Sequence, residues 1–305
     1  MLWYDSFDDV IARELPALRV AAEEPMAKHT SFRIGGPARR MAFPADEGEL
    51  VRLLELTEKC GLRPLVLGNG TNVLYPDEGI DRLVINTRDL SALQMGEGEN
   101  EVVAEAGVQL AKLANFACAA GLAGLEFAHG IPGSVGGAVC MNAGAYGGEI
   151  RDVIVGARLW FPGEGVRFVP REELQLSYRH SILDEYPDAV VLSAVFRLAK
   201  GDSETIRAAM DELMARRKKS QPLEYPSAGS TFKRPQGYFA GALIQEAGLK
   251  GTAVGGAMVS PKHAGFVINT GGATCADVLG LIRLVQEKVR ENAGVELEPE
   301  VRIIH

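Results

Sequence analysis

A glycine-rich segment between Gly130 and Gly148 is the part of the sequence best suited to hold a ligand. Seven of its nineteen residues are glycine, and it carries almost no charge. Without Cβ atoms the backbone can approach a ligand closely, and successive N–H groups in such turns form concave sites for anions such as phosphate. Pro132, Ser134 and Asn142 add groups that can fix a ligand. A set of tight turns between strands is the alternative interpretation.

A second glycine cluster lies upstream, within Pro64–Leu74. The apolar run Leu65–Leu67 predicts a buried strand, and it ends in Gly68-Asn69-Gly70-Thr71-Asn72. The cluster does not match the Rossmann fingerprint, because Val73 stands where the third glycine belongs and no clear helix follows. Together, the two clusters predict two loops that hold one extended dinucleotide.

These clusters and four further segments resemble the UDP-N-acetylenolpyruvoylglucosamine reductase (MurB) family. The matching segments, in order, are Thr30–Ala38, Gly68–Leu74, Gly130–Gly148, Ser177–Arg179, Pro226–Pro235 and Leu297–Ile304. They cover nearly the whole chain apart from its N-terminal end. The short stretch from Ser181 to Val190 resembles the shorter, type II subclass, which lacks an inserted tyrosine-bearing loop over the substrate. The groups that close this active site are therefore left open.

The resemblance implies an α+β fold with a two-lobed FAD-binding domain of the vanillyl-alcohol oxidase (PCMH) type. A smaller α+β substrate-binding domain follows it. We expect an N-terminal helical arm at residues 1–20, the FAD-binding domain at residues 21–200 and the substrate-binding domain at residues 201–305. The last strand, at residues 295–305, is expected to carry Glu300 back to the active site.

The resemblance also implies a flavoenzyme of peptidoglycan synthesis, with non-covalent FAD and with NADPH as co-substrate. Such an enzyme reduces enolpyruvyl-UDP-N-acetylglucosamine to UDP-N-acetylmuramate. Hydride reaches one carbon of the double bond, and a proton reaches the carbon beside the carboxylate. Negative charge develops on that carboxylate, so a nearby cation stabilises the transition state more than the ground state.

Three residues resemble the family's catalytic groups. Arg179 matches the arginine at the carboxylate, which a guanidinium can hold through two hydrogen bonds. Ser230 matches the proton-donating serine. Glu300 matches the essential glutamate, either as a neutral acid that hydrogen-bonds the intermediate or as an anion that orients Arg179. Without the resemblance they are a surface arginine, a turn serine and a polar strand residue.

The other expected site residues form two groups. Those expected at FAD are Gly68, Asn69, Gly70, Thr71, Asn72, Gly130, Ile131, Pro132, Gly133, Ser134, Gly136, Gly137 and Ala138. Those expected at the substrate are Tyr178, Gln221, Lys233, Arg234 and His263. His263 also fits a purely structural role. We expect Lys233 or Arg234 to help the proton of Ser230 leave.

Composition limits the class of protein. The 305 residues suffice for two domains, and the net charge of −8 argues against general nucleic-acid binding. The four cysteines and five histidines show no metal-type spacing, so no metal is expected. Reduced cysteines and an acidic start without a signal peptide favour the cytoplasm. Leu110–Phe127 is apolar but contains charged residues, so it predicts a buried helix and not a membrane span.

The elements that would position these residues follow from periodicity. Expected helices are Ser6–Val20 with Ser6 as N-cap, Asp46–Cys60, Val108–Ala120, Glu204–Lys219 and Cys275–Ala293, the last between Thr274 and Gly294.

Two other functions stay open. A sugar or alcohol oxidase of the same fold would often bind flavin covalently through a histidine, here His129 beside the glycine-rich segment. A catalytically silent UDP-sugar-binding protein would be colourless. The oligomeric state and the choice between NADPH and NADH are also open.

Overall fold

The computed structural model describes residues 2–305, which form two compact units. Unit 1 contains the residues up to Ala22 together with Arg40–Asn69 and Arg82–Ala215. Unit 2 contains Glu23–Arg39, Gly70–Asp81 and Arg216–His305. Within residues 2–305, no helix is both long enough and apolar enough to cross a membrane.

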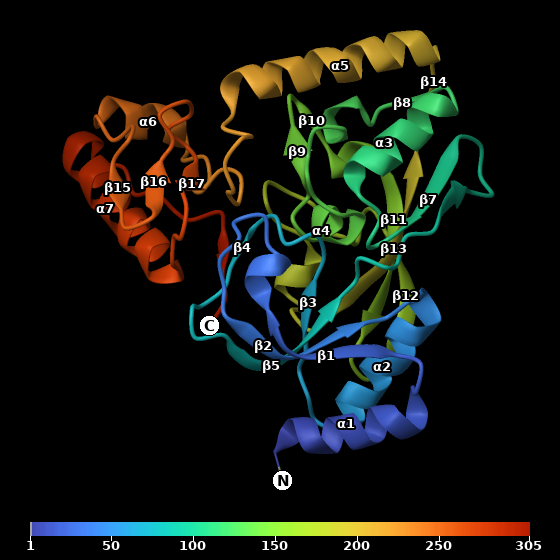
Figure 1. Cartoon of the computed structure of the whole chain (residues 1–305). Coiled ribbons are helices and arrows are strands. Elements are labelled where there is room, and N and C mark those ends of the chain that lie inside the picture. Colours follow the sequence, from blue (N-terminus) through green and yellow to red (C-terminus); the bar gives the residue numbers. More distant parts are fainter. Residues whose placement is uncertain (1) are drawn as a thin grey trace. The chain divides into compact units, whose positions relative to one another are not determined.

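Figure 1 labels the helices and most strands along the chain. The helices are α1 (Trp3–Glu14), α2 (Glu47–Lys59), α3 (Leu110–Ala119), α4 (Val135–Cys140), α5 (Ser203–Ser220), α6 (Ala240–Glu246) and α7 (Cys275–Ala293), with short 3-10 turns η1 (Met26–Lys28), η2 (Glu126–Ala128), η3 (Ile150–Asp152) and η4 (Ile182–Asp184). The strands are β1 (Arg19–Pro25), β2 (Pro37–Phe43), β3 (Leu65–Leu67), β4 (Val73–Leu74), β5 (Ile80–Asn86), β6 (Leu93–Met95), β7 (Glu101–Glu105), β8 (Leu122–Ala123), β9 (Gly144–Ala145), β10 (Gly148–Glu149), β11 (Ile154–Phe161), β12 (Gly165–Pro170), β13 (Val190–Arg197), β14 (Ala199–Lys200), β15 (Ala253–Val254), β16 (Ala257–Val259), β17 (Val267–Asn269) and β18 (Arg302–Ile303).

The two compact units interleave along the sequence, and neither of them is one continuous segment. Phe32, Ile34 and Leu74 share one apolar core with Val267 and Leu281. Burial in that core is why residues 23–39 and 70–81 join the C-terminal part. Three unit boundaries consequently fall within strands β1, β2 and β5. The functional division into residues 21–200 and 201–305 stays a prediction.

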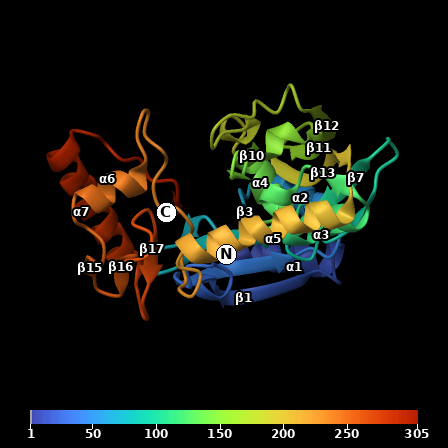
Figure 2. The same ribbon diagram turned by 90° about the horizontal axis from the view of Figure 1, so that it is seen from above.

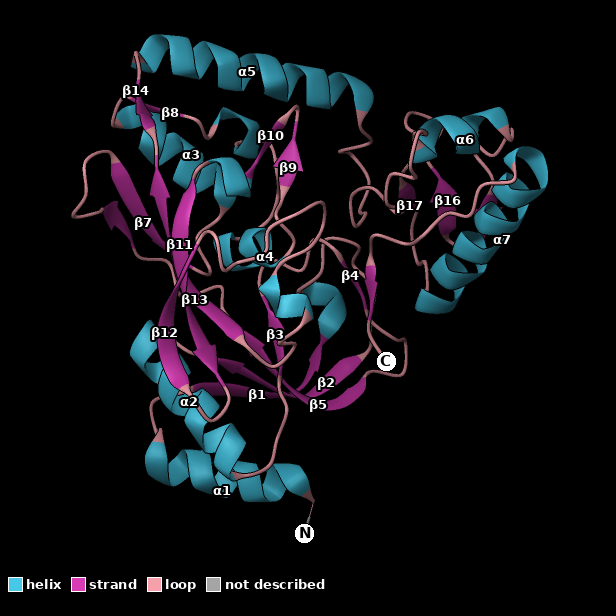
Figure 3. Ribbon diagram, turned by 180° about the vertical axis from the view of Figure 1, so that it is seen from behind, coloured by secondary structure: helices cyan, strands magenta, loops and turns pink. Residues whose placement is uncertain are grey.

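A five-stranded antiparallel sheet organises unit 1, with the order β12-β11-β13-β7-β6. Its central strand β13 is buried along almost its whole length, as its apolar sequence requires. The short helix α4, which is part of the glycine-rich segment, packs on β13 and β7 (Figure 3). The sheet therefore supports the segment that the sequence identifies as a ligand site.

The N-terminal helix is shorter than expected and begins earlier. It runs from Trp3 to Glu14, so Ser6 lies inside it and is not its N-cap. Pro16 explains the early end, because the residue before a proline avoids helical dihedrals. Residues 19 and 20, expected in the helical arm, begin strand β1. Side chains of α1 and α2 share one apolar cluster.

Within unit 1, helix α3 runs beside the part of α5 that ends at Ala215, as Figures 1 and 2 both show. The Arg207 guanidinium of α5 donates to Oδ1 of Asn115 on α3 at 2.6 Å. The expected glycine stop of α3 is present, since Gly121 adopts a φ of +66° that other residues avoid. Of the apolar stretch Leu110–Phe127, only Leu110–Ala119 forms the predicted buried helix, because Gly121 ends it and the chain continues into strand β8 and the 3-10 turn η2.

Unit 2 combines the antiparallel sheet β15-β16-β17 with helices α6 and α7. The predicted caps of α7 are confirmed, because the Thr274 side chain accepts from the N–H of Asp277 and Gly294 is left-handed. The expected closing strand is reduced to Arg302–Ile303, which pairs in parallel with β4. Glu300 lies outside this strand, because the segment around Pro299 pairs instead with residues 231–233, through a bridge between Pro299 and Phe232.

Candidate active site

Gly68 and Asn69 of the first glycine cluster contact the second cluster within unit 1. The side-chain amide of Asn69 donates to the carbonyl of Pro132. A Cβ added to Gly68 would collide with the hydroxyl of Ser134, so the backbone at Gly68 lies directly against that side chain. The upstream half of the first cluster therefore adjoins the Gly130–Gly148 segment, which is the geometry that a dinucleotide shared by two loops requires.

The hydroxyl of Ser134 has no hydrogen-bond partner within residues 2–305, although the residue is only 3% exposed. An unsatisfied buried hydroxyl is costly, and such groups are rare in folded proteins. A bound FAD would supply an acceptor to this hydroxyl beside a surface of bare glycine backbone. The residues present therefore fit the cofactor that the sequence implies.

Other expected cofactor residues make close contacts with protein instead. Gly136 donates its N–H to the carbonyl of Ala106 at 2.8 Å, and a Cβ at Gly136 would lie 3.0 Å from the Cβ of Ala106. Gly70 lies in unit 2 with a φ of +62°, and there it faces the carbonyl of His29. Packing favours glycine at both positions, and the positive φ favours it further at Gly70.

Arg179 lies in a tight turn of unit 1. The backbone groups of Ser177 and His180 form two hydrogen bonds of 3.2 Å around Tyr178 and Arg179. Arg179 has a φ of +56°, a conformation that few non-glycine residues adopt. Its guanidinium carbon lies 5.4 Å from the ring centroid of Tyr178, which is 52% exposed. Such backbone strain is typical of functional sites.

Ser230 and Glu300 come together in unit 2. The N–H of Glu300 donates to the carbonyl of Thr231 at 2.8 Å, so Glu300 lies across from the residue next to Ser230. The side-chain amide of Asn72 donates to the carbonyl of Glu300 at 3.0 Å. Asn72, expected at FAD, therefore adjoins an expected catalytic residue.

The expected substrate residues of unit 2 have different surroundings. Lys233 forms an ion pair with Glu298, so its charge is already partly neutralised. The guanidinium of Arg234 lies over the ring of Phe239, with its central carbon 3.9 Å from the centroid. In the part of the chain that the structure describes, Oε1 of Gln221 is buried without a hydrogen-bond partner.

His263 uses one ring nitrogen within its own turn. Its Nδ1 accepts from the N–H of Gly265 at 3.1 Å. Burial lowers the pKa of His263 most strongly, its own backbone opposes this shift, and the charge of Lys250 adds to it. The ring is therefore held neutral, and only Nε2 is left for a ligand.

Phe239 is a residue that sequence reasoning missed. In the sequence it reads as an apolar residue of the helical pattern from Tyr238, yet it is 62% exposed. It occupies the N-cap position of α6. The apolar periodicity of the sequence does not show that Phe239 is exposed. The structure shows this exposure, together with the contact of its ring with Arg234.

His129 directly precedes the glycine-rich segment, and one of its two ring nitrogens makes no hydrogen bond among the described residues. Its Nδ1 is buried without a hydrogen bond among the described residues. Burial lowers the pKa of His129, the charge of Arg207 lowers it further, and Asp211 opposes the shift.

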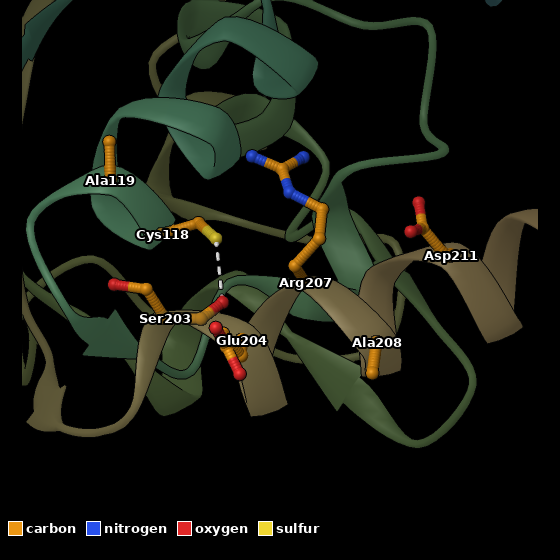
Figure 4. A pocket seen from close by; sticks show the side chains of 7 residues that line it. All are labelled: Cys118, Ala119, Ser203, Glu204, Arg207, Ala208 and Asp211. Carbon is orange, nitrogen blue, oxygen red and sulfur yellow. Dashed lines mark hydrogen bonds between the residues drawn. The ribbon is translucent and has the colours of Figure 1, made fainter.

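A surface groove between α3 and α5 contains none of the expected site residues. Figure 4 shows its lining, which is Cys118, Ala119, Ser203, Glu204, Arg207, Ala208 and Asp211. Cys118 donates to the carbonyl of Ser203 at 3.5 Å. No group of three or more potential metal ligands occurs between residues 2 and 305.

Comparison with known proteins decides the family. A model of the FAD binding domain matches residues 38–168, and a model of the C-terminal domain of UDP-N-acetylenolpyruvoylglucosamine reductase matches residues 221–304. The enzyme of that name from Agathobacter rectalis is 51% identical, with 98% of each chain covered. That from Caldanaerobacter subterraneus subsp. tengcongensis is 48% identical, with 92% of each chain covered. This chain belongs to the UDP-N-acetylenolpyruvoylglucosamine reductase family.

Structural similarity agrees with this membership. The crystal structure of the MurB reductase from Thermus caldophilus matches with a TM-score of 0.82 at 36% identity, over 94% of this chain and 100% of that chain. The predicted family, two-part FAD-binding fold and peptidoglycan reductase activity with FAD and NADPH are confirmed. The length agrees with the shorter MurB subclass, and the cytoplasmic location is that of the family. The oxidase and the silent-protein alternatives are thereby set aside.

Proposed function

We propose that this chain reduces enolpyruvyl-UDP-N-acetylglucosamine with Arg179, Ser230 and Glu300 as its catalytic residues. The observation that supports the assignment best is the backbone pairing of Glu300 with Thr231, which brings Glu300 beside Ser230. FAD, when bound, supplies the hydride chemistry that links NADPH to the substrate. The partners are then two small molecules, a UDP-sugar and NADPH, and no nucleic acid.

FAD is held by two loops, Gly68–Asn72 and Gly130–Ala138. Support comes from the unsatisfied hydroxyl of Ser134 and from the bare backbone at Gly68 beside it. The matched FAD-binding model, residues 38–168, contains both loops, and the matched C-terminal model contains Ser230 and Glu300. These two matches support the predicted division into an FAD-binding part at residues 21–200 and a substrate-binding part at residues 201–305.

The protein's own groups act on charge and on one proton. Arg179 holds the substrate carboxylate and stabilises the negative charge that grows there. Ser230 gives its proton to the carbon beside that carboxylate. Glu300 hydrogen-bonds the developing intermediate or orients Arg179. The ion pair of Lys233 with Glu298 favours Arg234 over Lys233 as the cation that helps the Ser230 proton leave.

The groups of the substrate outside the reacting carbons are bound by Tyr178, Gln221, Lys233, Arg234 and His263. The buried, unpartnered Oε1 of Gln221 supports its assignment, because a substrate N–H or O–H would satisfy it. His263 contributes through Nε2 alone, since its Nδ1 accepts from Gly265.

Ser230→Ala tests the central assignment by separating the half-reactions. Hydride transfer from NADPH needs no proton from Ser230, so the flavin should bleach at nearly the parent rate. Reoxidation by the enolpyruvyl substrate should slow by about 10²–10⁴-fold, the usual contribution of general acid catalysis. Stopped-flow flavin absorbance measures both phases. Ser230→Cys should recover part of the rate, because a thiol also donates a proton.

Ser220→Ala is the control, because Ser220 is exposed at the end of α5, where its hydroxyl donates to the carbonyl of Arg216. It should leave both phases unchanged. Reoxidation of Ser230→Ala at the parent rate would show that Ser230 is not the donor and would return it to a turn serine.

A further inference from the structure

We propose that Asn142 and Ser181 are positioning residues that hold the turn bearing Arg179 against the end of helix α4. The inference rests on the proposed role of Arg179 and deepens it, because neither residue touches the reacting atoms. Both belong to unit 1 together with Arg179.

Asn142 connects the glycine-rich segment to the turn. Its Nδ2 donates to the carbonyl of Ser177 at 3.1 Å and to a carboxylate oxygen of Glu149 at 3.0 Å. Its Oδ1 accepts from the N–H of Arg151 at 2.9 Å. Asn142 is only 1% exposed, so this amide is buried with its two donors and its acceptor all in use. A buried, satisfied amide of this kind fixes the positions of the groups it joins.

Ser181 fixes the other side of the same turn. Its Oγ donates to the carbonyl of Cys140 at 2.7 Å, and the residue is fully buried. Cys140 is the last residue of α4, where helix carbonyls lack intrahelical partners. The four residues that close the turn, 177–180, are thus tied to the end of α4 both before and after Arg179.

The turn needs these ties because it is strained and exposed. Arg179 has a φ of +56°, and only two backbone hydrogen bonds of 3.2 Å close the turn. Relaxation of Arg179 to a negative φ would redirect its long side chain. The loss of either tie lowers the energetic barrier to that relaxation. We therefore expect these residues to act on the substrate carboxylate through Arg179.

Asn142→Gly is the sharpest test, because Asn142 itself has a φ of +42° that glycine adopts without strain. Flavin reduction by NADPH should keep nearly the parent rate. Reoxidation by the enolpyruvyl substrate should slow by about 10- to 100-fold, the usual effect of a misplaced catalytic group. In an Arg179→Ala background the same substitution should have almost no further effect on reoxidation. Ser181→Ala should behave alike and keeps the test valid if Asn142→Gly folds poorly.

Asn115→Ala is the matched control. Asn115 is a half-buried asparagine of unit 1, whose Nδ2 donates to the carbonyl of Ala111 and whose Oδ1 accepts from Arg207. Its loss should lower the melting temperature without a selective effect on reoxidation, and it should combine additively with Arg179→Ala.

The outcomes separate the two ideas. If Arg179→Ala reoxidises normally, the proposed role of Arg179 fails, and the positioning role fails with it. If Arg179→Ala is slow but Asn142→Gly and Ser181→Ala reoxidise normally, only the positioning role fails. The positioning role also fails if the reoxidation rate losses of Asn142→Gly or Ser181→Ala multiply independently with the loss caused by Arg179→Ala. A loss of flavin reduction and reoxidation to the same extent would indicate a structural role instead.

Discussion

Ser134→Ala should affect the free protein and the flavin complex in opposite directions. The Ser134 hydroxyl is buried, lies against Gly68 and has no partner among the residues that the structure describes. In the protein without FAD the hydroxyl is therefore an unsatisfied group. In the complex we expect it to donate to the cofactor.

The magnitudes follow from those two environments. An unsatisfied buried hydroxyl costs about 1–3 kcal/mol, so its removal should leave the flavin-free protein at least as stable. A hydrogen bond to a charged acceptor such as a diphosphate contributes about 1.5–3 kcal/mol. The dissociation constant of FAD should then rise about 10- to 150-fold.

The assay combines thermal unfolding of the flavin-free protein with an FAD titration followed by flavin fluorescence. Ser260→Ala is the matched control, because the buried hydroxyl of Ser260 accepts from the N–H groups of Lys262 and His263 at 3.2 Å each. That control should lower the melting temperature and leave FAD affinity unchanged. A Ser134→Ala protein that is less stable without flavin but binds FAD normally would refute the reasoning.

Four further predictions follow from the same contacts. Gly68→Ala should weaken FAD binding, because its Cβ would displace the Ser134 hydroxyl. Adding Ser134→Ala should weaken FAD binding no further, because the Cβ atoms of residues 68 and 134 would then lie at an ordinary 3.5 Å. Additive losses of FAD affinity in a titration would contradict this. Gly136→Val should lower the melting temperature even without flavin, because its side chain meets Ala106, whereas an unchanged melting temperature with weaker FAD binding would locate Gly136 at the cofactor. Because the pKa of His263 in the folded protein lies below its ordinary value of 6.5, the unfolded chain takes up the proton first as the pH falls, and the free energy of unfolding decreases below pH 6.5. His263→Asn removes this titration but keeps an acceptor for the N–H of Gly265. Urea unfolding between pH 7 and 5 should therefore show a shallower decline in stability for His263→Asn than for the parent. Acid precipitation should release all the flavin into the supernatant, whereas flavin retained by the protein would indicate a covalent bond such as one through His129.

Local patterns in the sequence predicted several elements correctly. The α7 helix with its Thr274 and Gly294 caps, and α3 with its glycine stop, depend on neighbouring residues alone. The N-terminal arm failed because a helical pattern of apolar residues continued past Pro16, where the chain turns into strand β1. The closing strand failed because alternation cannot show how much of a segment finds a partner.

By itself, the sequence determined the family and the fold class, because these are encoded in ordered motifs of contiguous residues. The roles of Arg179, Ser230 and Glu300 stay predictions from the same motifs. Only the tertiary structure decided which of these residues meet. Asn142 and Ser177 are far apart in sequence, as are Thr231 and Glu300, and their contacts exist because packing brings separate segments together. The empty hydrogen-bonding capacity of Ser134 is likewise invisible in the sequence, because satisfaction of a polar group depends on everything that surrounds it.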